Sequence, residues 1–220
     1  MTPTETSRSR GTLIAVVAVV CGLAGFAFTV LIRPIGPSHK LPWIIARATG
    51  IGAFVAMTLL IGVGMAFRWP PRTRARATHP ELLLRLHSAL GPSVVALVVA
   101  HVISLLRDPY AGVSLTAVFV PGAATYRPNA VALGAVAAEM LVIVSATAML
   151  AGRVAVRHHW ARLHLLAYPT WILTWLHGVL SGSDATTLRL LYAAAAVFVG
   201  AMAIPRVMRA SRSHQTAVSR

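Results

Sequence analysis

Apolar residues dominate six segments of this chain, and polar or turn-forming residues separate these segments. They cover roughly residues 11–32, 43–67, 82–106, 129–151, 160–180 and 188–205. Each is about as long as an α-helix that crosses a hydrocarbon layer of roughly 30 Å. Backbone groups inside a bilayer must satisfy one another, and no alternating strand pattern is present, so the segments are predicted to be helices. We therefore expect an all-α fold, a six-span transmembrane helical bundle.

The same pattern suggests one structural unit with short flanks. We expect a cytoplasmic tail over 1–10, the six-helix membrane domain over 11–208 and a basic cytoplasmic tail over 209–220. The longest connection, 107–128, contains the apolar stretch Val113–Val120, which is too short to cross the membrane twice. We expect this stretch to be surface-lying or re-entrant and able to cap the outer end of the bundle.

Composition narrows the class of protein. Hydrophobic residues make up 57% of the chain and charged residues 11%, against about 25% charged in ordinary soluble domains. This balance excludes a soluble enzyme and a disordered protein. The single cysteine, Cys21, lies inside the first apolar segment, so neither a disulfide framework nor a thiolate metal cluster is expected.

The net charge of +15 is mainly a topology signal. Basic residues flank the apolar segments and do not form a stripe with interleaved aromatics, so no nucleic-acid partner is expected. If the N-terminus is cytoplasmic, 14 of the 20 Lys and Arg residues lie on the inner side. The outer side then keeps Arg33, Lys40, Arg47, Arg107, Arg127 and Arg189. The positive-inside rule therefore predicts both termini inside, in a multi-pass protein of the cytoplasmic membrane whose lipids are its first partners.

Four of the nine histidines fall inside predicted spans. His87 and His101 lie 14 residues apart on the third span, and His164 and His177 lie 13 apart on the fifth. Burying an ionisable group without a partner costs several kcal/mol, so such residues are functional candidates by default. At about 1.5 Å per residue, both separations correspond to roughly 20 Å along a helix.

The third and fifth spans of an up-and-down bundle run in the same direction. His87 and His164 should then share an inner level, and His101 and His177 an outer level. One imidazole from either side suits bis-imidazole ligation of a haem iron, with two haems stacked across the membrane. At about 100° per residue, the third-span pair shares a face, but 13 residues leave the fifth-span pair about 140° apart. Pro169 lies between them, and a kink or local rewinding there would be needed.

The residues around these histidines resemble a known family. The stretch Trp160–Tyr168, which contains Leu163-His164, and the later Leu176-His177-Gly178 look like the fifth span of the ferric reductase and NADPH oxidase transmembrane domain. Arg85-Leu-His87-Ser-Ala-Leu-Gly91, followed by His101, looks like its third span, and Ser145–Arg157 is similar to its fourth span and cytoplasmic loop. The resemblance covers about residues 45–205.

This resemblance implies a di-haem b protein that passes electrons from a cytoplasmic-side donor to an outer-side acceptor. It implies that His87 and His164 ligate the inner haem and that His101 and His177 ligate the outer one. Family members with a flavin- and NADPH-binding domain continue well beyond the sixth span, whereas no nucleotide fingerprint is legible here. We therefore expect a short, bacterial-type haem subunit of an oxidoreductase, with a separate flavoprotein or quinol as its donor.

The sequence leaves more than one possible role open for several other residues. Arg85 and Arg162 lie near the inner level, where they can bind haem propionates or anchor helices at the inner surface. Gly91 and Gly178 can admit a flat macrocycle or serve ordinary helix packing. Glu139, halfway through the fourth span, can be protonated, pair with Arg47, relay protons or make an interhelical hydrogen bond.

Two rival functions remain. A b561-like cytochrome that oxidises a quinol would carry paired histidines on four adjacent spans, whereas here they fall on two. A haem-free transporter or structural bundle would use the histidines for proton or metal transfer. No catalytic residue or substrate pocket is legible in the sequence.

Overall fold

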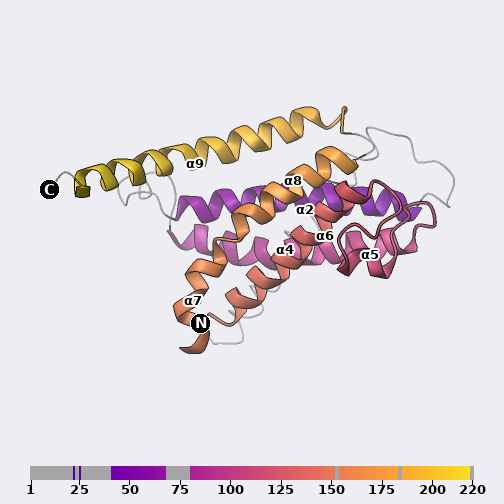
Figure 1. The fold of residues 1–220 in the computed structure, drawn as a ribbon, viewed down its shortest axis with the longest axis horizontal. Coiled ribbons are helices and arrows are strands. Elements are labelled where there is room, and N and C mark those ends of the chain that lie inside the picture. The colour runs from indigo at the N-terminus through magenta and orange to yellow at the C-terminus, as the bar shows by residue number, and fades with distance from the viewer. Residues whose placement is uncertain are drawn as a thin grey trace.

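The computed structural model describes Gly22, Gly25 and residues 41–67, 80–151, 154–182 and 185–218. This described part is helical and holds no strand, which confirms the all-α prediction for these residues. The helices in chain order are α2 (Leu41–Ala66), α4 (Pro80–Arg107), α5 (Leu115–Phe119), α6 (Pro128–Met149), α7 (Val154–His164), α8 (Ala167–Ser181) and α9 (Arg189–Val218) (Figure 1).

Three of these helices, at 41–66, 81–107 and 128–149, are long and apolar enough to cross a membrane by length and composition. They match the second, third and fourth predicted spans to within two residues at each end. The sixth predicted span corresponds to the apolar part of α9, residues 189–204, which is a shorter apolar helix. The first predicted span, 11–32, and the tail at 1–10 lie outside the described residues, apart from Gly22 and Gly25, which are helical.

The fifth predicted span is two helices. α7 ends at His164 and α8 begins at Ala167, with a turn between them. Around this turn the N–H groups of Leu165, Leu166 and Tyr168 each donate to the carbonyl three residues earlier, at 3.0–3.1 Å. Pro169 lacks an N–H and its ring crowds the preceding turn, so the break that it predicts is present. Because such tight turns advance by about 120° per residue instead of about 100°, they rotate His164 relative to α8.

α2 forms the centre of the bundle. It packs along α4 and also contacts α8 and α9, while α6 packs on α7 and α8. The α2 face toward its neighbours is rich in small buried residues, including Ala48, Gly52, Ala53 and Ala56, which allow close approach of helices in a membrane. Phe54, Met57 and Ile61 of α2 fill the core between these helices.

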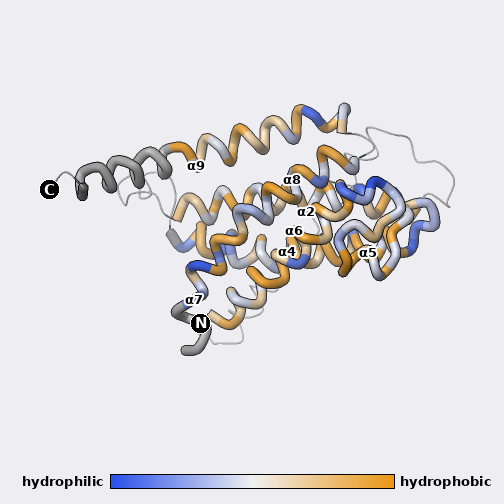
Figure 2. The backbone as a smooth tube through the Cα atoms, viewed as in Figure 1, coloured by the Kyte–Doolittle hydropathy of each residue, from blue (hydrophilic) through white to orange (hydrophobic). Residues whose placement is uncertain are grey.

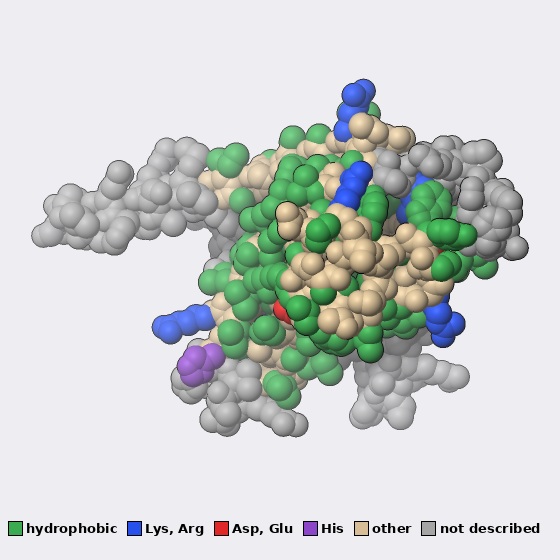
Figure 3. Space-filling view, turned by 45° about the vertical axis from the view of Figure 1, so that its right-hand side comes forward, with side chains coloured by type: hydrophobic (Ala, Val, Ile, Leu, Met, Phe, Trp, Pro, Cys, Tyr) green, Lys and Arg blue, Asp and Glu red, His purple; other side chains and the backbone are tan. Residues whose placement is uncertain are grey.

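The exterior is strongly apolar. Large hydrophobic side chains are exposed along α4, α6 and α9, among them Ile103, Val142, Leu190 and Val197. α2, α4, α6 and α8 are hydrophobic along much of their length (Figure 2), and apolar side chains cover much of the face shown in Figure 3. A surface of this kind suits contact with lipid chains and agrees with a membrane protein.

The connection between α4 and α6 folds over one end of the bundle. Its helix α5 is capped by Ser114, whose hydroxyl accepts a hydrogen bond from the Ala117 N–H at 3.2 Å. Ala117 is buried against the bundle, while Leu115 and Phe119 are exposed. The segment therefore packs over an end of the bundle, as the expectation of a cap requires. At the other end α9 runs past the neighbouring helices (Figure 1), and its helical backbone continues to Val218, through most of the predicted basic tail.

Candidate functional site

Two pairs of histidines face each other across the bundle. His101 of α4 and His177 of α8 have their ring centroids 6.5 Å apart, with ring planes inclined by 80°. His87 of α4 and His164, at the end of α7, have centroids 6.1 Å apart and planes inclined by 59°. The structure therefore pairs the four histidines as the sequence predicts, and the turn before Pro169 lets both fifth-span rings face α4.

The rings of the His101/His177 pair are held by backbone carbonyls of neighbouring helices. Nδ1 of His101 lies 2.7 Å from the carbonyl oxygen of Ala46 in α2. Nδ1 of His177 lies 2.9 Å from the carbonyl oxygen of Ala130 in α6. A carbonyl only accepts hydrogen bonds, so Nδ1 carries the proton in both rings. The neutral tautomer then leaves the lone pair on Nε2, the arrangement typical of a histidine that binds a metal through Nε2.

Glycines of the neighbouring helices lie directly against these rings. A Cβ atom added to Gly50 of α2 would lie 2.8 Å from Nδ1 of His101. A Cβ added to Gly134 of α6 would lie 2.7 Å from Nδ1 of His177. These positions leave no room for even a methyl group, and an alanine at either would displace the imidazole or the helix.

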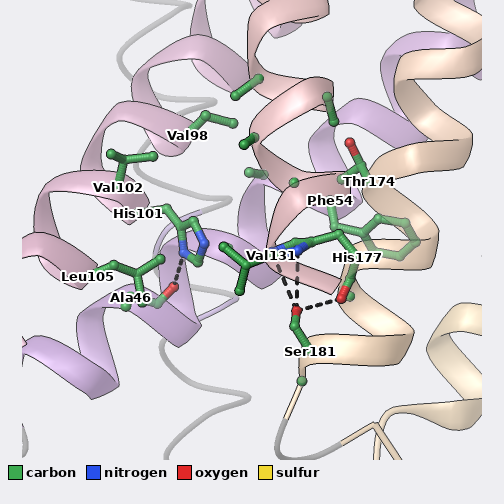
Figure 4. A pocket seen from close by; sticks show the side chains of 18 of the residues that line it. Ala46, Phe54, Val98, His101, Val102, Leu105, Val131, Thr174, His177 and Ser181 are labelled. Carbon is green, nitrogen blue, oxygen red and sulfur yellow. Dashed lines mark hydrogen bonds between the residues drawn. The ribbon is translucent and has the colours of Figure 1, made fainter. Parts of the chain in front are cut away.

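A cavity of about 210 Å³ adjoins the His101/His177 pair. Both imidazoles are directed toward it, from α4 on one side and α8 on the other (Figure 4). Its other walls are mostly apolar, with Phe54 and Met57 of α2 toward the core and Ala117 of α5 under the cap. One water needs roughly 10–15 Å³, so the cavity offers space for part of an organic group.

Arg47 also lines this cavity. Its guanidinium lies over the Trp43 ring, 4.4 Å from the centroid, a typical cation–π distance. The sequence pattern predicts Arg47 only as an outer charge or a counter-ion for Glu139. Arg47 follows Ala46, whose carbonyl binds His101, and only the packing of α2 against α4 brings it to this site.

Aromatic rings enclose the His87/His164 pair. Trp160 stacks on His164 with centroids 5.3 Å apart and planes inclined by 27°, and Phe67 meets His87 edge-on at 5.8 Å. Nδ1 of His87 and Nε1 of Trp160 are buried, and neither has a hydrogen-bond partner among the described residues. The backbone of Leu60 in α2 interacts with the His87 ring outside the geometry of an ordinary hydrogen bond.

The two arginines predicted beside this pair occupy exposed positions on α4 and α7. Arg85, two residues before His87 on α4, and Arg162, two residues before His164 on α7, are both exposed. Their exposure fits either a surface anchor or a group that binds the polar edge of a ligand. Both therefore remain predicted ligand-binding residues.

The glycines predicted near the histidines differ from each other. A Cβ added to Gly91, one turn after His87, would meet no atom within 4 Å, so open space lies beside it. A Cβ added to Gly178 would lie 2.7 Å from the Tyr192 hydroxyl of α9. Gly178 therefore lets α9 pack closely on α8, and it also lines the cavity at His177. Gly91 has no close neighbour that would require a glycine.

Glu139 lies on the exposed side of α6. No hydrogen bond or ion pair joins it to another described residue, and it does not line the cavity at Arg47, although its α6 neighbours Gly134, Ala138 and Leu141 do. The predicted pairing with Arg47 and the predicted interhelical hydrogen bond are therefore both absent from the described part of the chain.

The tryptophans inside α8 belong to the core. Nε1 of Trp171 donates to the Thr58 hydroxyl of α2 at 3.0 Å, and Nε1 of Trp175 donates to the Tyr192 carbonyl of α9 at 3.0 Å. Trp171 also stacks against Phe54, with centroids 6.4 Å apart. These contacts join α8 to α2 and α9 in the region between the two histidine pairs.

Together these features define an all-helical protein of membrane-spanning type, with two stacked levels of paired histidines in its interior. No protein-family model, no curated protein and no solved structure matches the chain.

Proposed function

We propose that this chain is a di-haem b membrane protein that transfers electrons from a cytoplasmic-side donor to an outer-side acceptor. The observation that supports this proposal most directly is that two pairs of histidines face each other. Their ring centroids are 6.1 Å apart in the His87/His164 pair and 6.5 Å apart in the His101/His177 pair. A metal binds an imidazole nitrogen at about 2.0–2.1 Å, and the ring centroid lies roughly 1.1 Å behind that nitrogen. Two imidazoles that bind one metal from opposite sides therefore have centroids about 6.3 Å apart. Both observed separations fit this distance.

The donor set favours haem over a bare ion. Each level offers two imidazoles from opposite sides, and the walls around the His101/His177 pair are mostly apolar. This suits an iron whose remaining ligands belong to a macrocycle. Among the described residues there is no cluster of three or more His, Cys, Asp or Glu side chains. When bound, haem iron supplies one-electron redox chemistry that side chains lack.

The chain's own residues would hold and orient this group. His87 and His164 would hold the haem at one level, and His101 and His177 would hold it at the other. The Ala46 and Ala130 carbonyls keep the outer Nδ1 atoms protonated, which directs the lone pairs of Nε2 to the centre. Arg85 and Arg162 at the inner level, and Arg47 at the outer, have the charge to bind the propionate carboxylates.

The proposed topology has six spans with both termini in the cytoplasm. α2, α4 and α6 are three of these spans, α7 with α8 forms a broken fifth, and the apolar part of α9 forms the sixth. The His87/His164 level then lies toward the cytoplasm, and the His101/His177 level lies under the α5 cap on the outer side. A reporter enzyme fused to the C-terminus should be active only on the cytoplasmic side, and activity outside would contradict the orientation.

We also propose membership of the ferric reductase-like group, as the membrane haem component of an oxidoreductase. The donor would be a separate flavoprotein or quinol. The spacing of histidines on α4 and on α7–α8 supports this reading over a b561-like arrangement on four adjacent helices.

A reduced-minus-oxidised absorbance spectrum of the purified full-length protein tests the proposal. We expect b-type bands and two haems per chain by pyridine haemochrome assay. Protein in sealed vesicles loaded with ferricyanide should pass electrons from external dithionite, and a His101→Ala variant should not. Absence of b-type bands would favour a haem-free transporter or structural bundle.

A further inference from the structure

Three histidine rings contact a neighbouring helix in the same way, at a backbone group and at the glycine four residues after it. The His101 ring meets the Ala46 carbonyl and Gly50, and the His177 ring meets the Ala130 carbonyl and Gly134. In both cases the glycine follows the carbonyl by four residues. His87 repeats the spacing, since its ring interacts with the Leu60 backbone and lies 3.4 Å from a Cβ added to Gly64.

Helix geometry explains the four-residue spacing. A helical side chain leans toward the N-terminus and covers the turn that precedes its own Cα. The side chain at position i+4 therefore shields the carbonyl of residue i, whose first lone pair already accepts the intrahelical hydrogen bond. A glycine at i+4 uncovers the second lone pair of that carbonyl. A ring from the neighbouring helix can then reach it.

The register of α2 against α4 aligns two glycines of α2 with the two histidines of α4. Gly50 and Gly64 are 14 residues apart on α2, and His87 and His101 are 14 apart on the antiparallel α4. Gly50 meets His101 and Gly64 meets His87. One helix therefore presents one glycine to each histidine of α4.

We propose that Gly50 and Gly134 are positioning residues that open the Ala46 and Ala130 carbonyls to His101 and His177, and so fix Nε2 as the metal-binding atom. This inference rests on the proposed function. A hydrogen bond from Nδ1–H to a carbonyl makes the imidazole a more basic ligand. A more basic ligand stabilises ferric over ferrous iron, so the two carbonyls lower the reduction potential of the outer haem. At the other level, the contact between the His87 ring and the Leu60 backbone lies outside the geometry of an ordinary hydrogen bond, so this effect should be weaker there.

Single alanine substitutions test this role in the full-length protein. Gly50→Ala and Gly134→Ala place a methyl group 2.8 and 2.7 Å from Nδ1 of the two histidines. Gly62→Ala is the matched steric control, because its Cβ would lie 2.5 Å from the Phe198 ring of α9 and near no histidine. Gly200→Ala, with no atom within 4 Å, controls for the loss of a glycine itself.

The readouts are haem per chain, the midpoint potentials of the two haems and the low-temperature electron paramagnetic resonance signals of the ferric forms. We expect Gly50→Ala and Gly134→Ala to lose the outer haem or to shift its potential to more positive values, with the inner haem unchanged. Gly62→Ala and Gly200→Ala should keep both haems and both potentials. Gly64→Ala, at a contact of 3.4 Å, should produce a smaller change confined to the inner haem.

Thermal unfolding of each variant separates a folding defect from a local effect. If Gly50→Ala does not fold, Gly134→Ala on a different helix carries the same test. An unchanged outer haem in both variants would overturn the inference, as would an equal change in Gly62→Ala. A wild-type protein without b-type bands would overturn the proposed function itself, and this inference with it.

Discussion

The imidazole rings of His101 and His177 face each other from α4 and α8, with centroids 6.5 Å apart and Nδ1 of each ring bonded to a different neighbouring helix. The two rings are therefore oriented independently. Under the proposed function, loss of either imidazole should remove the haem that the two rings hold and leave the other haem in place. The His87/His164 pair is held by other contacts.

We predict that His101→Ala and His177→Ala each reduce the haem content from two per chain to one. Pyridine haemochrome assays on purified protein give the count. His159→Ala is the control, since His159 is exposed on α7 and faces no paired ring in the described structure. Complete loss of haem from folded single variants would contradict two independent levels.

The second prediction concerns Trp160. Its indole stacks on His164 and restricts the rotation of that imidazole. Trp160→Ala should lower inner-haem occupancy, whereas Trp160→Phe keeps a flat ring and should retain most of it. Trp175→Phe is the control, because Trp175 binds the Tyr192 carbonyl and stacks on no histidine. Equal occupancy in Trp160→Ala and wild type would exclude this orienting role.

The third prediction concerns stability. The Thr58 hydroxyl accepts the buried hydrogen bond from Trp171. Thr58→Val would leave the indole N–H without its acceptor, which costs about 1–3 kcal/mol of unfolding free energy. Thr49→Val on the same helix removes a hydroxyl that bonds carbonyls of its own helix, so its effect should be smaller. Thermal or denaturant unfolding in detergent measures both, and equal losses would argue against the interhelical bond.

The fourth prediction concerns Glu139. This carboxyl lies halfway along α6 on its exposed side, where acidic residues cost roughly 2.5–3.5 kcal/mol on insertion scales. Glu139→Leu should increase the inserted fraction of the protein and leave haem content unchanged. Val142→Gln, at a position 64% exposed on the same helix, should decrease insertion. A drop in haem content or electron transfer in Glu139→Leu would instead implicate the carboxyl in the redox core.

The helical pattern could be predicted because apolar segments of this length have one stable backbone arrangement in a bilayer. The second to fourth spans were predicted to within two residues, and Pro169 predicted the break between α7 and α8. The exposure of Glu139 could not be predicted. Its place on α6 fixes its direction relative to that helix, but only packing decides which side of α6 meets α8.

The site was only partly visible in the sequence. The four histidines stood out because polar groups are costly in a membrane. Arg47, Gly50 and Gly134 did not, since their roles depend on which carbonyl and which ring they meet across two helices. Small residues are common wherever membrane helices pack, so a glycine carries no signal until its neighbour is known.

The sequence alone determined the helical class, the three helices that are long and apolar enough to cross a membrane, and the spacing of the four histidines. Hydrophobic length and helical rise act along one chain segment at a time, so no tertiary contact is needed to predict them. The tertiary structure decided which rings face each other, which carbonyls orient them and which glycines make room. Those relations depend on the register between helices, and register follows from the packing of side chains far apart in the sequence.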